Sequence, residues 1–340
     1  MDFKKTPLEQ FDYIFPKELI AQAPAKPRDA TRLLIYNRQT DETFFDTFFN
    51  LPKYLPPRAV LVFNETKVIP ARFTVSKSTG GTCTLLYLNK VAYQKMKVLA
   101  DRKLKIGSIL TGDGGLELEV ENQNEGDYIL KTSTKNFDQW LTKYGVAPLP
   151  PYIKNSPLSR AQAKREYQTI FAKIAGSVAA PTASLHFTKR LLKKLQVLGF
   201  TIRFVTLHVG LGTFAKITEE NLEQNALHNE RYKLSGSTAK LLGKAKKEGR
   251  PIIAVGTTVV RTLESYAKTG KLSGNTDLFI RPGFDFKSVD GMITNFHVPR
   301  SSLMMLVSAL TGRQRLLQLY REAIIRRFRL FSFGDGMLVL

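Results

Sequence analysis

Apolar and polar residues follow two patterns along this 340-residue chain, and the first dominates the part after residue 160. Short apolar runs alternate there with segments whose apolar residues recur at every third or fourth position, the spacing of an amphipathic helix. The strand-like runs there are 201–209 and 251–256, joined by an earlier run at 59–64, and the helix-like segments are 189–200, 238–250 and 313–331. Strands alternating with helices predict an α/β fold, with a mixed or mostly parallel sheet covered by helices.

The second pattern occupies residues 73–150. Short alternating runs are separated there by turns rich in Gly, Asn and Asp, which predicts a small β-barrel domain inserted into the α/β fold. A proline-rich stretch within 146–159 closes the insertion. We therefore expect an α/β catalytic domain formed by residues 1–72 and 151–340, interrupted by a barrel formed by residues 73–150.

The charge of the chain narrows the class of partner. Lysine and arginine number 51 against 29 aspartates and glutamates, a formal net charge of +22. Such an excess favours a polyanionic partner, with nucleic acid ahead of an anionic membrane, although a general solubility bias is an alternative. The basic residues gather on the three segments predicted to be helices, which indicates a phosphate-binding track or simply a solvated helix face.

Other features bear on compartment and cofactors. The single cysteine, Cys83, excludes an internal disulfide and leaves no cysteine cluster for zinc or an iron–sulfur centre. The N-terminal segment lacks the apolar core of a signal peptide, and apolar stretches such as 302–310 are too short to span a bilayer. We expect a cytoplasmic protein that does not enter the membrane.

Four histidines lie in segments that suggest a composite site. His186, His208 and His297 lie in runs of small and apolar residues that follow predicted strands, where α/β enzymes place their chemistry. Asp290 and Asp335 are the carboxylates that could support them in proton transfer. His228 lies in an acidic segment that we predict to be helical, which suits a surface residue as well as a functional one. The histidine spacing does not indicate a local metal site.

Three loops of small residues are candidates for ligand binding. Residues 256–258 link a predicted strand to a predicted helix, whose free backbone N–H groups suit a carboxylate, phosphate or ribose. The alternative is that Thr257 or Thr258 caps the helix, and the other two loops could serve packing alone. The predicted ligand-binding residues are Pro181, Thr182, Ser184, Gly210, Gly212, Thr213, Gly256, Thr257, Thr258 and Asn295.

Long ordered motifs make the chain similar, nearly end to end, to one enzyme family. They include PRDATRLL (27–34), VFNETKVIPARF (62–73), GSVAAPTASLHFT (176–188), FVTLHVGLGTF (204–214), AVGTTVVRTLES (254–265), RPGFDFKSVDGMITNFHVPRSSLMMLVSAL (281–310) and FSFGDGM (331–337). In these motifs the chain resembles the S-adenosylmethionine:tRNA ribosyltransferase-isomerases of queuosine biosynthesis. It departs from the usual family residues at Lys67, Thr84, Ser184 and Arg281.

The resemblance implies a definite reaction. The family transfers and isomerises the ribosyl part of S-adenosylmethionine onto 7-aminomethyl-7-deazaguanine at the tRNA wobble position, giving epoxyqueuosine-tRNA and releasing adenine and methionine. S-adenosylmethionine is the co-substrate, tRNA the partner, no metal is expected, and we expect a monomer. The three histidines would move protons, the three loops would hold the donor, and Lys67, Arg72 and the basic helices would bind the anticodon arm.

Two alternatives remain at this point. Another S-adenosylmethionine-dependent RNA-modifying enzyme, such as a methyltransferase, would usually carry a glycine-rich loop after its first strand, and no such loop follows residues 59–64. A divergent paralogue could instead bind tRNA without turnover. The intact histidine loops count against this alternative.

Overall fold

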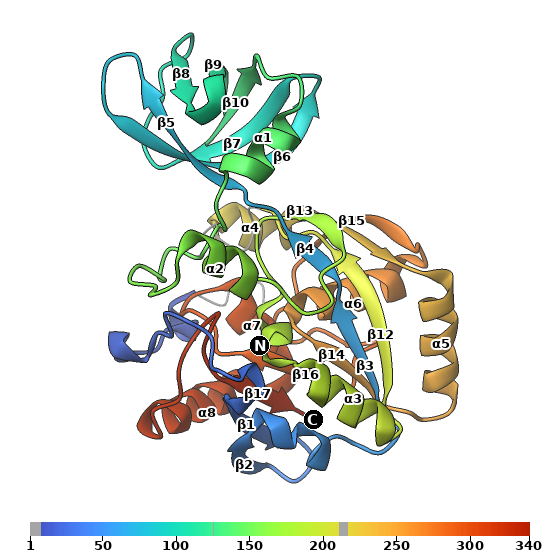
Figure 1. Cartoon of the computed structure of the whole chain (residues 1–340). Coiled ribbons are helices and arrows are strands. Elements are labelled where there is room, and N and C mark those ends of the chain that lie inside the picture. Colours follow the sequence, from blue (N-terminus) through green and yellow to red (C-terminus); the bar gives the residue numbers. More distant parts are fainter. Residues whose placement is uncertain (1–7, 125, 211–216) are drawn as a thin grey trace.

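The structure is a computed structural model that describes residues 8–124, 126–210 and 217–340. Its larger part is built on a nine-stranded sheet (Figure 1). In spatial order the strands are β15 (Ser273–Leu278), β13 (Ala226–Leu234), β12 (Thr201–Leu207), β3 (Val60–Asn64), β14 (Ile252–Val255), β16 (Gly291–Asn295), β17 (Gly336–Val339), β1 (Arg32–Asn37) and β2 (Glu42–Thr47). Four neighbouring pairs are parallel and four antiparallel, so the predicted mixed sheet is confirmed.

The middle of the sheet is buried on both faces, as its sequence requires. Every residue of β3 and of β14 is buried, which is typical of parallel strands covered on two sides. Val60 and Val62 pack with residues of one face, whereas Leu61 and Phe63 pack with residues of the other. The covering helices are α3 (Lys189–Val197), α5 (Gly236–Lys247), α6 (Thr257–Thr269), α7 (Ser302–Thr311) and α8 (Arg313–Ile325).

Two predicted boundaries are wrong. The helix expected over 313–331 ends at Ile325, because Arg327 adopts a left-handed conformation and the amide of Phe328 turns back to the carbonyl of Ala323. This turn directs Phe328 into the core, where it is fully buried. The segment around His228 is not helical either. The short α4 (Glu219–Gln224) ends there at a left-handed Asn225, and β13 begins with the next residue.

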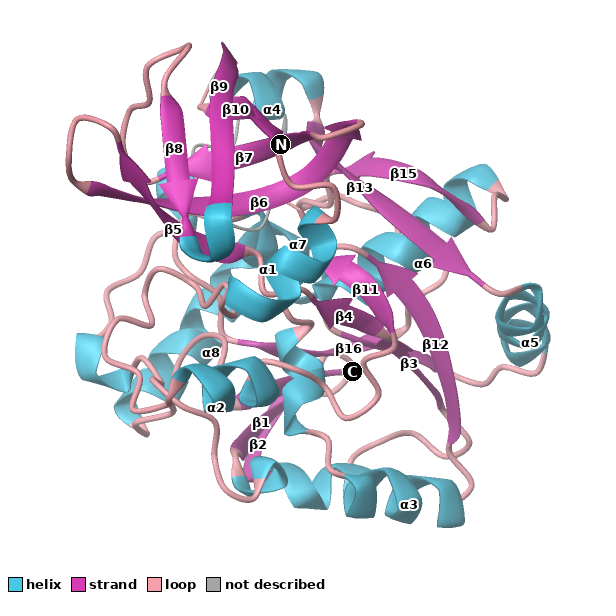
Figure 2. Cartoon of the chain, turned by 45° about the horizontal axis from the view of Figure 1, so that its top comes forward, coloured by secondary structure: helices cyan, strands magenta, loops and turns pink. Residues whose placement is uncertain are grey.

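The smaller part is the predicted inserted barrel, which the structure confirms. Six strands close on one another in the order β10-β7-β6-β5-β8-β9 (Figure 2). They are β5 (Arg72–Lys77), β6 (Thr82–Ala92), β7 (Lys95–Ala100), β8 (Ile109–Gly112), β9 (Leu116–Asn124) and β10 (Asp127–Thr132). Trp140 and Leu141 of the helix α1 (Phe137–Tyr144) join the barrel's own hydrophobic core.

Two short strands and one close contact join the barrel to the sheet. The strand β4 (Thr66–Val68) continues from β3 toward the barrel and pairs with β11 (Ile174–Ser177). The Gln168 side chain, just beyond α2 (Arg160–Glu166), bonds both backbone groups of Val68. A Cβ at Gly145 would lie 2.0 Å from the carbonyl oxygen of Pro70, so the returning chain needs glycine there. The barrel is therefore held beside the carboxyl end of β3. In the described part of the chain, the longest apolar helices fall short of a membrane span.

Candidate active site

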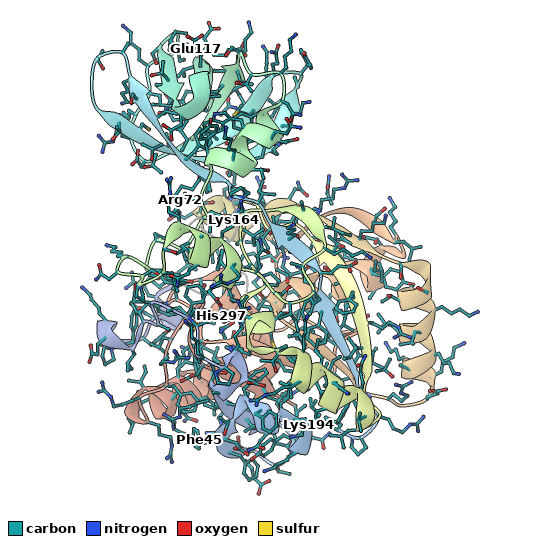
Figure 3. The ribbon with its side chains drawn as sticks, viewed as in Figure 1. Phe45, Arg72, Glu117, Lys164, Lys194 and His297 are labelled. Atoms are coloured by element: carbon teal, nitrogen blue, oxygen red, sulfur yellow. The ribbon has the colours of Figure 1, made fainter. Side chains whose placement is uncertain are left out.

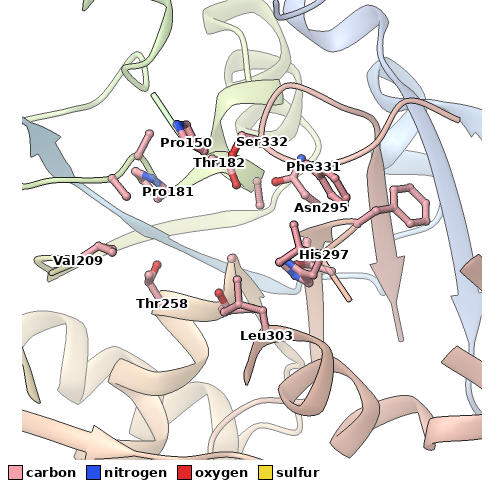
Figure 4. A pocket seen from close by; sticks show the side chains of 18 of the residues that line it. Pro150, Pro181, Thr182, Val209, Thr258, Asn295, His297, Leu303, Phe331 and Ser332 are labelled. Carbon is pink, nitrogen blue, oxygen red and sulfur yellow. The ribbon is translucent and has the colours of Figure 1, made fainter. Parts of the chain in front are cut away.

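A pocket of about 870 Å³, measured out into its open mouth, lies where several strands end (Figure 4). Strands β3, β14 and β16 run parallel, so their carboxyl ends meet at one edge of the sheet. The pocket is lined there by residues 256–258 and 294–298, by the loop at 179–183, and by aromatic residues from the segments before α2 and before β17.

The N-terminus of α6 opens directly into the pocket. Gly256 has φ of 95°, which favours glycine, and turns the chain from β14 into the helix. No described side chain caps the helix, so the alternative of a capping Thr257 or Thr258 is wrong. The Thr258 hydroxyl instead accepts a hydrogen bond of 3.2 Å from Asn64 at the end of β3. The helix therefore presents its free N-terminal amides to the pocket.

Asn295 lines the pocket with its side-chain orientation fixed from behind. The hydroxyl of Thr31 donates to the carbonyl of Arg28, so it accepts from Nδ1–H of His186, 3.3 Å away. Nε2 of His186 is then an acceptor, and it receives the Asn295 amide group at 3.1 Å. This assignment turns Oδ1 of Asn295 away from His186. That oxygen is buried and has no hydrogen-bond partner among the described residues.

His186 itself does not line the pocket. It ends the short 3-10 helix Thr182–His186, whose first two residues do line it, and its ring packs 4.8 Å from that of Phe48. Burial, helped by Arg329 and Arg28, lowers the pKa of His186 to about 3. The imidazole is therefore neutral near pH 7, with both ring nitrogens hydrogen-bonded. Its position is one residue layer behind the pocket wall.

His297 is the histidine that forms part of the wall (Figure 4). Nε2 lies 2.7 Å from the hydroxyl of Thr294, and the backbone amide is held by the hydroxyl of Tyr320 at 2.9 Å. No described residue bonds Nδ1. Burial lowers the pKa of His297 to about 3, so this ring too is neutral near pH 7. It offers a hydrogen-bonding nitrogen to whatever the pocket contains.

The sequence analysis missed a buried ion pair in the pocket. Glu230 of β13 and Arg261 of α6 both line it and are 3% and 8% exposed. The guanidinium also donates to the carbonyls of Thr276 and Leu278, and the other oxygen of Glu230 accepts the amide of Gly210 at 3.3 Å. The two residues lie 31 positions apart in the sequence, and no local pattern indicates that they meet.

Three aromatic side chains, also missed, form part of the pocket wall. Tyr152, Tyr167 and Phe331 line it, and the rings of Tyr152 and Phe331 lie 4.9 Å apart. The hydroxyl of Tyr152 is 2.6 Å from that of Ser332. Burial raises the pKa of Tyr152 to about 12, so the phenol stays protonated.

The remaining predicted catalytic residues do not line the pocket. His208 is half-buried beside it, with Nδ1 2.8 Å from the hydroxyl of Thr66, and burial lowers its pKa. Asp335 is buried behind His186, where its two oxygens accept the amides of Arg32 and Arg329. Burial raises the pKa of Asp335. Asp290 precedes β16, and its carboxylate bonds the amide of Ile252, so it lies at the opposite end of these strands.

Some of the predicted ligand-binding residues line the pocket, and others do not. Those that line the pocket are Pro181, Thr182, Gly256, Thr257, Thr258 and Asn295. Ser184 is fully buried behind the wall, with a negative φ and a hydroxyl that lacks a partner among the described residues. Gly210 lies next to the pocket, where its amide bonds Glu230. Gly212 and Thr213 lie outside the described residues. His228 is exposed and lines a smaller hollow that shares Arg261 and Leu303 with the pocket.

The predicted basic helices do not converge on the pocket. Figure 1 places α3 and α8 on the side of the α/β part opposite the barrel, and Figure 3 shows Lys194 of α3 there. Exposed cations nearer the strand ends are Lys67 of β4 and Lys173 before β11, whose strands pair with each other. Arg72 lies at the barrel junction, where its guanidinium donates to the carbonyl of Leu149. Within the described ranges, no three His, Cys, Asp or Glu side chains gather as metal ligands would.

The other residues at which the chain departs from the usual pattern lie outside the pocket. Thr84 is on barrel strand β6, where its amide bonds Asp101. Arg281 stacks its guanidinium over the ring of Phe279, 5.5 Å from the centroid. These substitutions therefore leave the pocket wall itself unchanged.

Comparison with known proteins gives full-length matches. The family described as queuosine biosynthesis protein matches residues 8–339. A protein from Carboxydothermus hydrogenoformans, named S-adenosylmethionine:tRNA ribosyltransferase-isomerase, is 46% identical and covers 98% of this chain and 99% of its own length. A protein of the same name from Aquifex aeolicus is 44% identical, with the same coverage. The crystal structure of S-adenosylmethionine tRNA ribosyltransferase from Thermotoga maritima matches with a TM-score of 0.57 and 35% identity, over 97% of this chain and 100% of that one.

Proposed function

The chain belongs to the queuosine biosynthesis protein family, and we propose on that basis that it is an S-adenosylmethionine:tRNA ribosyltransferase-isomerase. It transfers and isomerises the ribosyl part of S-adenosylmethionine onto the 7-aminomethyl-7-deazaguanine of a tRNA wobble position. The products are epoxyqueuosine-tRNA, adenine and methionine. The observation that carries the proposal is the end-to-end match to enzymes of this name, at 46% and 44% identity.

The pocket suits a cationic donor. S-adenosylmethionine carries its own electrophile, the sulfonium, so the protein has to position two substrates and move protons. Tyr152 and Phe331 are among the lining residues, and an aromatic face attracts a cation by about 0.5–2 kcal/mol. The adjacent Gly256 and Thr182 keep the wall small, which lets the donor approach the backbone closely.

His297 is our candidate for the proton-accepting group. The aminomethyl group of the acceptor must be neutral to attack carbon, and a neutral imidazole in the wall can take up its proton. Burial lowers the pKa of His297 to about 3 in the empty pocket, which leaves the ring unprotonated but makes it a weak base, so this role requires that the bound substrates raise that pKa toward the working pH. His186 has both nitrogens bonded, so we assign it a positioning role, through Asn295.

Lys67 and Lys173 are our candidates for contacts with the tRNA backbone. Both are exposed at the junction between pocket and barrel, and the chain's net charge of +22 favours a polyanion. We expect Lys67→Ala and Lys173→Ala each to weaken tRNA binding and to reduce the slope of log affinity against log salt by about 0.7–0.9.

Fluorescence anisotropy with labelled tRNA at several salt concentrations measures that slope. Lys193→Ala, at an exposed position of α3 far from the barrel, is the matched control and should leave it unchanged. Equal slopes for all three variants would contradict the assignment.

A product assay tests the function itself. The protein is incubated with S-adenosylmethionine and tRNA that carries the 7-aminomethyl-7-deazaguanine precursor, and the products are separated by mass spectrometry. We expect adenine and methionine in equal amounts together with modified tRNA. Release of S-adenosylhomocysteine would indicate a methyltransferase, and tRNA binding without any product would indicate a non-catalytic paralogue.

A further inference from the structure

Two neighbouring features of the pocket lack hydrogen-bond partners. One is a set of free donors, and the other is a free acceptor. The 13-residue helix α6 points its uncapped N-terminus into the pocket, with Thr257 and Thr258 as its first residues. Their amides have no intrahelical partner, and the helix dipole adds a partial positive charge, so this end favours an anion. Among the described residues lining the pocket, the cationic side chain is Arg261, and Glu230 already neutralises it.

The second feature is the buried side-chain oxygen of Asn295. The residue is 2% exposed, and its Oδ1 has no partner among the described residues. With Nδ1–H of His186 directed at Thr31, Nε2 accepts from the amide nitrogen of Asn295, and this arrangement turns Oδ1 the other way. A buried acceptor left without a donor costs about 1–3 kcal/mol, so this atom favours a ligand that brings a hydrogen-bond donor to it.

The register of the sheet places the two features together. Val255 of β14 pairs with Ile293 of β16, so Thr257 and Asn295 stand two positions beyond the same pair on neighbouring strands. Figure 4 shows Asn295 and Thr258 on facing sides of one cavity. The pocket thus offers an anion site and a free hydrogen-bond acceptor at the ends of neighbouring strands.

We propose that this corner holds the α-amino-acid end of the sulfonium donor, with its carboxylate at the amides of Thr257 and Thr258 and its ammonium at Oδ1 of Asn295. An α-amino acid carries both groups on one carbon, which matches the pairing of the two sites. The inference rests on the proposed function, and it names the group of the donor that this wall recognises. It also explains why both ring nitrogens of His186 are hydrogen-bonded, because these bonds let His186 set the direction of the Asn295 oxygen.

The experiment removes one backbone N–H. Thr257→Pro deletes the amide at the first helical position, where proline is tolerated, and ψ of 152° at Gly256 suits a residue before proline. Thr257→Val keeps the amide and the side-chain shape, and it is the matched control. Isothermal titration calorimetry compares the affinity of each protein for S-adenosylmethionine and for its decarboxylated analogue.

We expect the wild type and Thr257→Val to bind S-adenosylmethionine about 10–100-fold more tightly than the decarboxylated analogue. In Thr257→Pro this ratio should fall several-fold, while affinity for the analogue stays the same. Asn295→Leu should similarly reduce the preference for S-adenosylmethionine over an analogue that lacks the α-amino group. An unchanged ratio in Thr257→Pro would overturn the proposal. Weaker tRNA binding by Thr257→Pro without donor would assign the helix end to a backbone phosphate, which overturns it as well.

A measurement on the unmodified protein covers the case in which Thr257→Pro does not fold. The amide resonances of Thr257 and Thr258 should shift with S-adenosylmethionine and much less with the decarboxylated analogue, and equal shifts would overturn the proposal. The wild-type product assay separates this inference from the function. If adenine and methionine are released but the ratio test fails, the amino-acid site alone is wrong. If the wild type neither binds nor consumes the donor, the proposed function is wrong.

Discussion

The wall of the pocket and the layer of side chains behind it are built from similar residues but differ in how their polar groups are satisfied. In the wall, Asn295 Oδ1 and the amides that begin α6 lack protein partners among the described residues. In the layer behind, His186 and Asp335 have hydrogen bonds at both ring nitrogens and at both carboxylate oxygens. The difference teaches that polar groups without protein partners lie where a ligand can supply the missing hydrogen bond. Groups with all their hydrogen bonds made lie behind them and fix the orientation of the wall.

The largest expected effect is on His297. His297→Gln should lower turnover by about 10²–10⁴-fold, because the glutamine amide accepts hydrogen bonds but takes up no proton. The free energy of unfolding should change by less than about 1.5 kcal/mol, since the imidazole side chain has one protein hydrogen bond among the described residues. Adenine release and urea unfolding measure the two quantities. A folded variant with turnover within tenfold of the wild type would remove His297 from proton transfer.

For His186 the main expected effect is on the free energy of unfolding and not on turnover. His186→Ala leaves a cavity beside Phe48 and deprives Thr31 and Asn295 of partners, so it should lower the free energy of unfolding by about 3–5 kcal/mol. His208→Ala is the control, because that ring is half-buried and its loss should cost less. Urea unfolding measures both. A smaller loss for His186→Ala than for His208→Ala would mean that the layer behind the wall does not stabilise the fold as we argue.

The two buried histidines also predict a pH dependence. Burial lowers the pKa of each to about 3, against about 6.5 in an unfolded chain. As the pH falls below 6.5, the unfolded state binds protons that the native state does not, so stability is full above this pH and declines toward pH 3. Each histidine contributes a slope approaching about 1.4 kcal/mol per pH unit.

Urea unfolding at pH 7, 6 and 5 measures this slope. His186→Gln and His297→Gln should each give a shallower decline than the wild type, because each removes one of the two groups. If all three proteins lose stability in parallel, the histidines are not the source of the pH dependence.

The smallest expected effect is at Ser184, the exception to the contrast between the pocket wall and the layer behind it. Ser184 lies in the layer behind the wall, yet its buried hydroxyl has no described partner, whereas the equally buried Ser177 bonds the carbonyl of Ala179 and the amide of Val209. Ser184→Ala should change the free energy of unfolding by less than about 1 kcal/mol, with a gain as the favoured direction, and Ser177→Ala should cost about 1–3 kcal/mol. Thermal unfolding of both variants is the test. An equal cost would show that Ser184 has a partner in solution.

Periodicity predicted most of the fold because it reports burial. Residues 59–64 are continuously apolar and form β3, buried on both faces, and the alternating runs after residue 73 form the barrel. The failures came where tertiary contacts outweighed local spacing. Phe328 continues the helical repeat of α8, but it reaches the core through a left-handed Arg327 instead.

The sequence likewise predicted some parts of the candidate site and missed others. Sequence position indicated which loops follow strands, and residues 256–258 and 295–297 do line one pocket. The sequence could not indicate that Asp290 lies at the other end of its strand, because a residue before a strand and one after it look alike in a loop. It could not pair Glu230 with Arg261 either, since that contact depends on how β13 packs against α6.

The sequence by itself determined most of the elements, the two architectures and the family, because hydrophobic spacing and ordered motifs are local properties of a chain. Only the tertiary structure decided which histidine faces the pocket and which one supports it. His186 and His297 are alike in their sequence surroundings, in burial and in the lowered pKa. They differ in whether neighbours from distant segments occupy both ring nitrogens, and that depends on strands that meet only in the folded sheet.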